Sequence, residues 1–544
     1  MILRVLHSQS KTVAFGAFLL AGSSLLSSVL GLFRDRLLAS TFGAGVELDM
    51  YFAAFRIPDF LYGILILGGL SASFLPVFSG YFQEDQKRAW KFAGQMLNVL
   101  VLALGGLAAV LFFFIPFLMP LVVPGFSSQD QETTSLLARV MLLSPIFFGI
   151  SALFSSLLQY FNRFLAFSLA PVMYNLGILG GIVFLVPFFG ITGVALGVVA
   201  GAVLHIAIQL IPAFSAGFKI APFSFSELRG IKRVAVLALP RTIGSGAAYL
   251  NPVIMTALAS TFAAGSIAIF SFANNLQMIP VGVVGISFSL AVFPHLSRAF
   301  AKKDTKEFSQ VFSLALRQII FLALPLSLFL FLLRAQIVRL VLGSGEFGWQ
   351  DTRLTSAALG IFAAGIVFQA LIPFLMRTFF SLQNTRIPAI SSVIALGINA
   401  VLAVSFVRAF QGGGVLGVWL QHFLRIGDLS DNAVIALPLA LVFGTVFQCA
   451  FLLFALGTKV QIWSKEIIGA MFKLLLACFA LIVASYIAMK IFGTLFLLTS
   501  YGQVLWQTVL ALVSGTLAFL LVSYAVQSQE LKEFFHSFKK QFHE

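Results

Sequence analysis

Charged residues interrupt two apolar stretches near the start of the chain. The segment GLFRDR contains Arg34, and the segment LDMYFAAFRIPDF contains Asp49, Arg56 and Asp59. In a helix, Asp49 and Arg56 share a face, and Asp59 lies one turn from Arg56. A charge at the centre of a bilayer costs about 2.5–3.5 kcal/mol, so charged side chains within a membrane should face a polar cavity or a partner.

Pro58 lies within the same charged segment. A proline removes an internal backbone hydrogen bond, so we expect a kink whose freed carbonyls line the cavity. A different interpretation stays open at this point: Arg34 and Arg36 could extend to the lipid headgroups, and Asp49 could cap a helix start.

The second half of the chain offers further polar candidates. Arg241 follows a proline, and Asn274, Asn275 and Gln277 form an amide cluster before another proline. If Arg241 faces the same cavity as the two arginines of the first half, the three cations suit an anionic headgroup such as a diphosphate. Arg241 could equally lie at the cytoplasmic interface, and the amides could satisfy one another between helices.

The residue patterns of common enzyme and metal sites are missing from the sequence. Its six histidines are scattered, and neither an HExxH motif nor a phosphate-binding lysine loop occurs. Cys449 and Cys478 both lie in apolar stretches, where a thiol behaves as a small hydrophobic group. We therefore expect no catalysis, metal or cofactor, and any transport to be driven by an ion gradient, the membrane potential or substrate flux.

The elements that must position these residues are membrane-spanning helices. Of 544 residues, 60% are hydrophobic and 10% charged, and the mean hydropathy is +1.03; this composition excludes an ordinary soluble protein. We predict an all-α integral membrane protein, because about fourteen apolar segments are long enough to cross a bilayer. The predicted spans are 12–33, 50–80, 91–120, 135–158, 167–189, 191–218, 232–260, 266–297, 308–340, 354–380, 387–410, 433–456, 466–492 and 503–526.

The distribution of Lys and Arg predicts the topology. With fourteen spans and the N-terminus inside, both termini and the even-numbered loops are cytoplasmic, and these segments hold most of the basic residues. The net charge of +15 is thus explained by orientation and by attraction to membrane lipids, so we expect no nucleic-acid partner.

An internal repeat is visible in the sequence. Residues 52–82 resemble residues 270–300, about 218 positions later, with Pro76 matching Pro294. Chance similarity between apolar helices is the alternative. Two halves of six helices around a central site are a common transporter plan. We predict two parallel six-helix lobes (1–218 and 219–456), two further helices (457–526) and a cytoplasmic tail (527–544).

Several motifs together resemble one known family. They are SSVLGLFRDRLLASTFGAG, LDMYFAAFRIPDF, FLPVFSGYF, FNRFLAFSLAP, PVGVVGISFSLAVFPHLS and FSLQNTRIP. With fourteen spans, the chain resembles the MurJ (MviN) lipid II flippase family of the MOP superfamily. The resemblance implies movement of an undecaprenyl-diphosphate-linked peptidoglycan precursor to the outer leaflet by alternating access. It also implies that the last two spans form a groove for the lipid tail.

The family resemblance assigns roles to three of the residues above. Arg34 matches the arginine of the first-span motif, Asp49 the second-span aspartate, and Arg56 a position that is usually Lys or Arg. Met255 stands where some members carry an acid linked to sodium binding, which argues against sodium coupling. Other charged positions of the family are changed here, at Ser28, Tyr62, Gly63, Leu67, Asn275 and Leu382.

The resemblance therefore implies a bacterial inner-membrane flippase for lipid II. Arg34 and Arg56 are expected to hold the diphosphate, with Asp49 orienting them and Arg241, Asn274 and Asn275 adding contacts. Two alternatives stay open: an exporter of another lipid-linked saccharide or amphiphile, and a transport-inactive scaffold. The segment 411–432 is expected to form an amphipathic helix at the outer interface.

Overall fold

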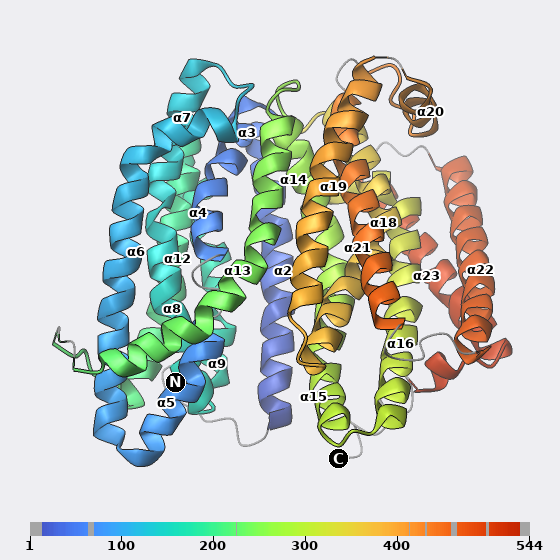
Figure 1. Cartoon of the computed structure of the whole chain (residues 1–544). Helices are drawn as coiled ribbons and strands as arrows, with labels where there is room; N and C mark the ends of the chain where they lie inside the picture. The colour runs from blue at the N-terminus through green and yellow to red at the C-terminus, as the bar shows by residue number, and fades with distance from the viewer. Residues whose placement is uncertain are drawn as a thin grey trace. The chain divides into compact units, whose positions relative to one another are not determined.

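The computed structural model describes residues 13–63, 70–222, 224, 226–412, 414–429, 432–457, 465–496 and 500–533. Helices account for all of its regular structure within these ranges, as predicted (Figure 1). The chain divides into two compact units, Met1–Ala268 and Ile269–Glu544. The lobe boundary near 218 stays a prediction.

The first unit contains the helices α2 to α13 and the start of α14. Their bounds are α2 Val13–Phe42, α3 Val46–Ala54, α4 Arg56–Tyr62, α5 Leu70–Glu84, α6 Gln86–Val122, α7 Ser128–Met141, α8 Leu143–Tyr160, α9 Phe164–Ser168, α10 Ala170–Gly180, η2 Gly181–Leu185, α11 Val186–Phe189, α12 Ile191–Ser215, α13 Leu228–Ala259 and α14 Ser266–Pro280.

The second unit contains the remaining helices. Their bounds are η3 Val281–Ile286, α15 Ser287–Ala301, α16 Thr305–Leu332, α17 Arg334–Val341, α18 Trp349–Ser381, α19 Arg386–Gln411, α20 Val415–Phe423, η4 Asn432–Ile435, α21 Ala436–Gly457, α22 Lys465–Leu495 and α23 Tyr501–Ala525.

Eleven helical stretches of the described residues are long and apolar enough to cross a membrane. The other three predicted spans fall on α2, on the interrupted series α3 to α5, and on α13. The predicted span 308–340 ends too late, because α16 stops at Leu332 and α17 starts separately at the charged Arg334. The chain is thus a multi-pass membrane protein.

Helices of the first unit approach closely where glycines face each other. A Cβ on Gly177 of α10 would lie 2.1 Å from the Cα of Gly201 on α12, and a Cβ on Gly181 would lie 2.5 Å from the Cα of Gly197. Within a lipid bilayer, burial of apolar side chains contributes little to helix association, because the lipid tails are also apolar. Helix pairs are instead stabilised by close packing, which small residues allow. These four glycines therefore explain why α10 and α12 lie side by side.

The helix bounds follow the register of the predicted repeat. Adding 218 to the bounds of α5 gives 288–302, and α15 covers Ser287–Ala301. Asp85 caps the next helix in the first unit and Asp304 caps it in the second. The backbone is also π-helical at Gly63 and over Val281–Ile286, and the register pairs 63 with 281.

Candidate functional site

The predicted kink near Pro58 is present as a break between two short helices. α3 ends at Ala54 and α4 begins at Arg56. The ring of a proline clashes with the carbonyl four residues earlier, which is that of Ala54. The break leaves Arg56 and Asp59 on a short helix of their own.

α4 carries the two charged residues Arg56 and Asp59. Arg56 is half-buried, and its Nε donates to the hydroxyl of Thr256 on α13 at 2.6 Å. Asp59 is exposed and lies in the first third of the predicted second span. A charged side chain within a span is expected to face a polar cavity or a partner, so we expect this side of α4 to face a cavity.

Arg34 of α2 is held by polar groups from its own helix and from α10. Its Nη2 lies 2.7 Å from Oδ1 of Asp35, and its Nη1 donates to Oδ1 of Asn175 at 3.4 Å. The amide of Asn175 donates in turn to the carbonyl oxygens of Ser27 and Pro171. These contacts place the guanidinium among helices rather than extended toward the headgroups.

Two tyrosines connect Arg34 with α4. Tyr51 of α3 and Tyr174 of α10 are each close enough to interact electrostatically with both Arg34 and Asp59. Arg34, Tyr51, Tyr174, Arg56 and Asp59 therefore form one polar group within the first unit. We call these five residues the α2–α4 cluster. Its two tyrosines were missed from the sequence, where a tyrosine in an apolar segment resembles core.

Asp49 has different partners from those expected. Its Oδ2 accepts from the backbone N–H of Gly265 and its Oδ1 from that of Ala268, both at 2.7 Å. The side chain is only 2% exposed. Asp49 thus caps the N-terminus of α14, where backbone N–H groups have no partner within the helix. This is a form of the capping alternative, with the cap on a helix far along the sequence.

The structure describes the surroundings of Gly63, Ser28 and Met255, three positions at which the chain differs from the family. A Cβ on Gly63 would lie 2.3 Å from the ring of Tyr249, so a larger residue at 63 is excluded while that ring is in place. Ser28 is exposed and bonds the carbonyl of Ser24, and Met255 is buried. Leu67 lies outside the described residues.

The polar candidates of the second half, Asn274, Asn275 and Arg241, do not form one group of described contacts. Asn274 accepts a hydrogen bond from Gln277, which accepts one from Gln369 at 2.8 Å, so these amides satisfy one another between helices. Asn275 makes interactions of its own. Arg241 lies on α13, and its side chain is outside the described residues. The described residues contain no group of three or more metal-ligating side chains.

A comparison with protein families identifies the chain. A family model described as Lipid II flippase MurJ matches residues 38–507. The chain belongs to the MurJ family. A relative from Rhizobium tropici, named probable lipid II flippase MurJ, is 28% identical over 393 residues, which cover 70% of this chain and 73% of the relative.

Solved structures show the same fold. A lipid II flippase MurJ in an inward closed conformation has a TM-score of 0.74 and 24% identity, covering 93% of this chain and 98% of that one. An inward-facing multidrug resistance MATE family transporter of the MOP superfamily has a TM-score of 0.60 and 16% identity, covering 79% and 94%. The MurJ chain described here therefore has the transporter fold shared by both.

Proposed function

We propose that this MurJ family member translocates lipid II from the inner to the outer leaflet of the bacterial cytoplasmic membrane by alternating access, for cell wall synthesis. The observation that supports it is the α2–α4 cluster, in which helices of the first unit bring two arginines and two tyrosines into one polar group. The ligand is then an undecaprenyl-diphosphate-linked glycan. The protein acts as a transporter rather than an enzyme, with both termini in the cytoplasm.

The two arginines of the cluster suit a diphosphate, which would compete for them with Asp35 and Asp59. Asp35 accepts from Arg34 through a single oxygen, and the partner of Arg56 at Nε is a neutral hydroxyl. Arg56 donates to Thr256 through Nε, so we propose that its two Nη groups grip a pair of phosphate oxygens. Two guanidinium groups on α2 and α4 can thus share one diphosphate.

Asp49 acts in this proposal as a positioning residue. Both of its oxygens bind backbone N–H groups of α14, so it holds α3, and through it α4, against a fixed helix end. Arg241, Asn274 and Asn275 are kept as further candidate contacts for the glycan. We assign no coupling ion.

Complementation tests the proposal. The native chain, Arg34→Ala, Arg56→Ala and the double variant are expressed in a bacterium depleted of its own lipid II flippase, with membrane levels measured. The matched control is Arg229→Ala, which removes an exposed arginine on α13. The readout beside growth is the fraction of lipid II that an enzyme added outside can cleave.

We expect the native chain and the control to restore both readouts, and each cluster variant to lower the cleaved fraction at least about tenfold, the usual cost of a lost charge-assisted hydrogen bond. Full activity of the double variant would refute the assignment of the arginines. Failure of the native chain, while it binds purified lipid II, points to host incompatibility. Failure of both readouts and of binding points to another lipid-linked saccharide or to a scaffold.

A further inference from the structure

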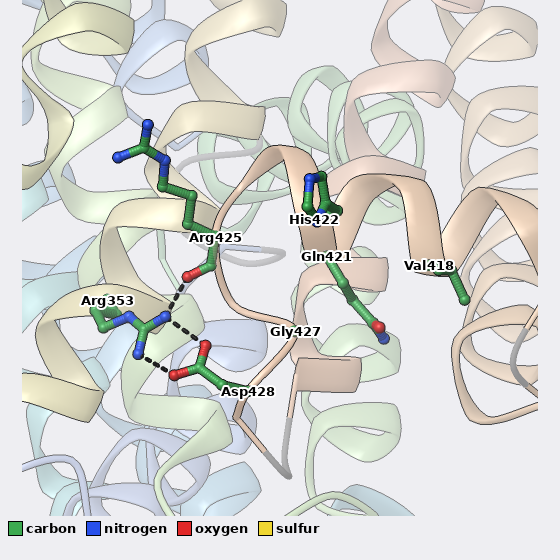
Figure 2. Close-up of a pocket in the computed structure, with 7 residues that line it drawn as sticks. All are labelled: Arg353, Val418, Gln421, His422, Arg425, Gly427 and Asp428. Atoms are coloured by element: carbon green, nitrogen blue, oxygen red, sulfur yellow. Dashed lines mark hydrogen bonds and ion pairs between the residues drawn. The ribbon is translucent and has the colours of Figure 1, made fainter.

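The connection between α19 and α21 lies at the ends of three membrane spans. Arg353, in the second turn of α18, donates to both oxygens of Asp428, with Nη1–Oδ2 at 2.6 Å and Nη2–Oδ1 at 2.5 Å, and also to the carbonyl of Arg425 (Figure 2). The connection itself joins the end of span α19 to the start of span α21. The short helix α20 is therefore held at the depth where spans leave the hydrocarbon.

One face of α20 packs on the protein and the other does not. Leu420 and Leu424 are buried. On the other side Val418, Trp419 and Phe423 are each more than half exposed, and the two rings stack at 5.3 Å with an interplanar angle of 5°. Aromatic side chains at this depth are typical of the membrane–water interface.

The charged residues beside α20 favour binding of an anion. A cavity of about 550 Å³ beside α20 is lined by Arg353, His422, Arg425 and Asp428, together with small and neutral residues (Figure 2). Asp428 is already engaged by Arg353. Arg334 also lies close enough to repel Arg425 electrostatically. The site thus carries more positive charge than its one carboxylate neutralises.

The backbone at Arg425 ends α20 and fixes the start of the loop. Its φ is +58°, a left-handed conformation that non-glycine residues rarely adopt. This conformation turns the carbonyl of Arg425 to Arg353 while its side chain stays exposed. Arg425 follows the C-cap residue Leu424, and the N–H of Ile426 donates to the carbonyl of Gln421, so this conformation is a common helix ending that fixes the direction of the loop.

We propose that α20 and its following loop bind an anionic phospholipid. Val418, Trp419 and Phe423 enter the boundary between headgroups and acyl chains, and His422 and Arg425 bind the phosphate. This lipid is a neighbour of the transporter, distinct from the substrate bound by the α2–α4 cluster, and it fixes the loop at the membrane surface.

The test uses the full-length protein in vesicles of phosphatidylcholine, in which either that lipid or added phosphatidylglycerol is brominated near the headgroup. Quenching of tryptophan fluorescence is compared between the native chain and Trp419→Phe, so that the difference reports Trp419 alone. The affinity for short-chain phosphatidylglycerol is measured in detergent for the native chain and Arg425→Gln. The matched control is Arg408→Gln, which removes an exposed arginine from the last turn of α19.

We expect Trp419 to be quenched more by brominated phosphatidylglycerol than by brominated phosphatidylcholine. Arg425→Gln should weaken phosphatidylglycerol binding about tenfold and remove this preference, while Arg408→Gln should change neither. Equal quenching by both lipids, or equal binding by Arg425→Gln, would overturn the proposal. Competition by inorganic phosphate at the same concentration as the lipid would show a free-phosphate site and also overturn it. Lipid II translocation is measured in parallel, and its loss in all variants would bear on the transport proposal instead.

Discussion

Replacing Asp49 separates a structural role from an electrostatic one. Asp49→Ala leaves the backbone N–H groups of Gly265 and Ala268 buried without an acceptor. Each unsatisfied buried donor costs about 1–3 kcal/mol, so we expect the two to lower the free energy of unfolding by about 2–6 kcal/mol. Asp49→Asn keeps one of the two acceptor oxygens, so one N–H group stays unsatisfied and the loss should be about half as large, about 1–3 kcal/mol.

The assay measures unfolding and transport on the same variants. Unfolding is followed by circular dichroism during titration with a denaturing detergent, and transport by the outside-accessible fraction of lipid II. If Asp49 acts through its cap, Asn should retain most of the transport and Ala should lose transport and stability together. If Asp49→Asn abolishes transport while its stability equals that of the native chain, the negative charge itself is needed and the capping explanation is wrong.

Three further changes test packing and pairing. Gly63→Ala should lower the unfolding free energy by about 1–3 kcal/mol because its methyl group would overlap the ring of Tyr249. In a double-mutant cycle, Tyr249→Ala should restore part of the stability lost in Gly63→Ala. Additive losses from the two substitutions would contradict the contact. Glu530→Gln breaks a buried ion pair with Arg317, so we expect the free energy of unfolding to fall by about 3–5 kcal/mol. Detergent denaturation measures this change, and a fall below about 1 kcal/mol would mean that the pair is solvated. Gly177→Val would force the backbones of α10 and α12 apart, so we expect no folded protein in the membrane. Size-exclusion chromatography measures this, and a normal elution profile would refute the close packing.

Much of the fold could be predicted because bilayer thickness constrains each span. Apolar length located the spans, and Pro58 located the break before α4, since a proline acts on a carbonyl only four residues away. The end of α16 was missed because hydropathy averages over a window and does not detect a single turn at Leu333. Hydropathy and proline positions therefore predicted which helices exist but not where every helix ends.

The site was predicted less well, for a reason of distance along the chain. Periodicity placed Asp49 on one helix face with Arg56, but the helix breaks at Phe55 between them. The partner of Arg56 is 200 residues away and the partners of Asp49 are more than 210 away. No spacing rule indicates which of many hydroxyls or helix ends such a side chain meets. Charge alone could suggest only that Asp49 and the arginines belong together.

The π-helical backbone at Gly63 and at Val281–Ile286 bears on the history of the molecule. A π turn accommodates one residue more than the α-helix around it, so it is the trace of a single inserted residue. The repeat register pairs the two positions, and one insertion in an ancestral half explains both. On this account the insertion would precede a duplication of the half, and each half would carry its own bulge.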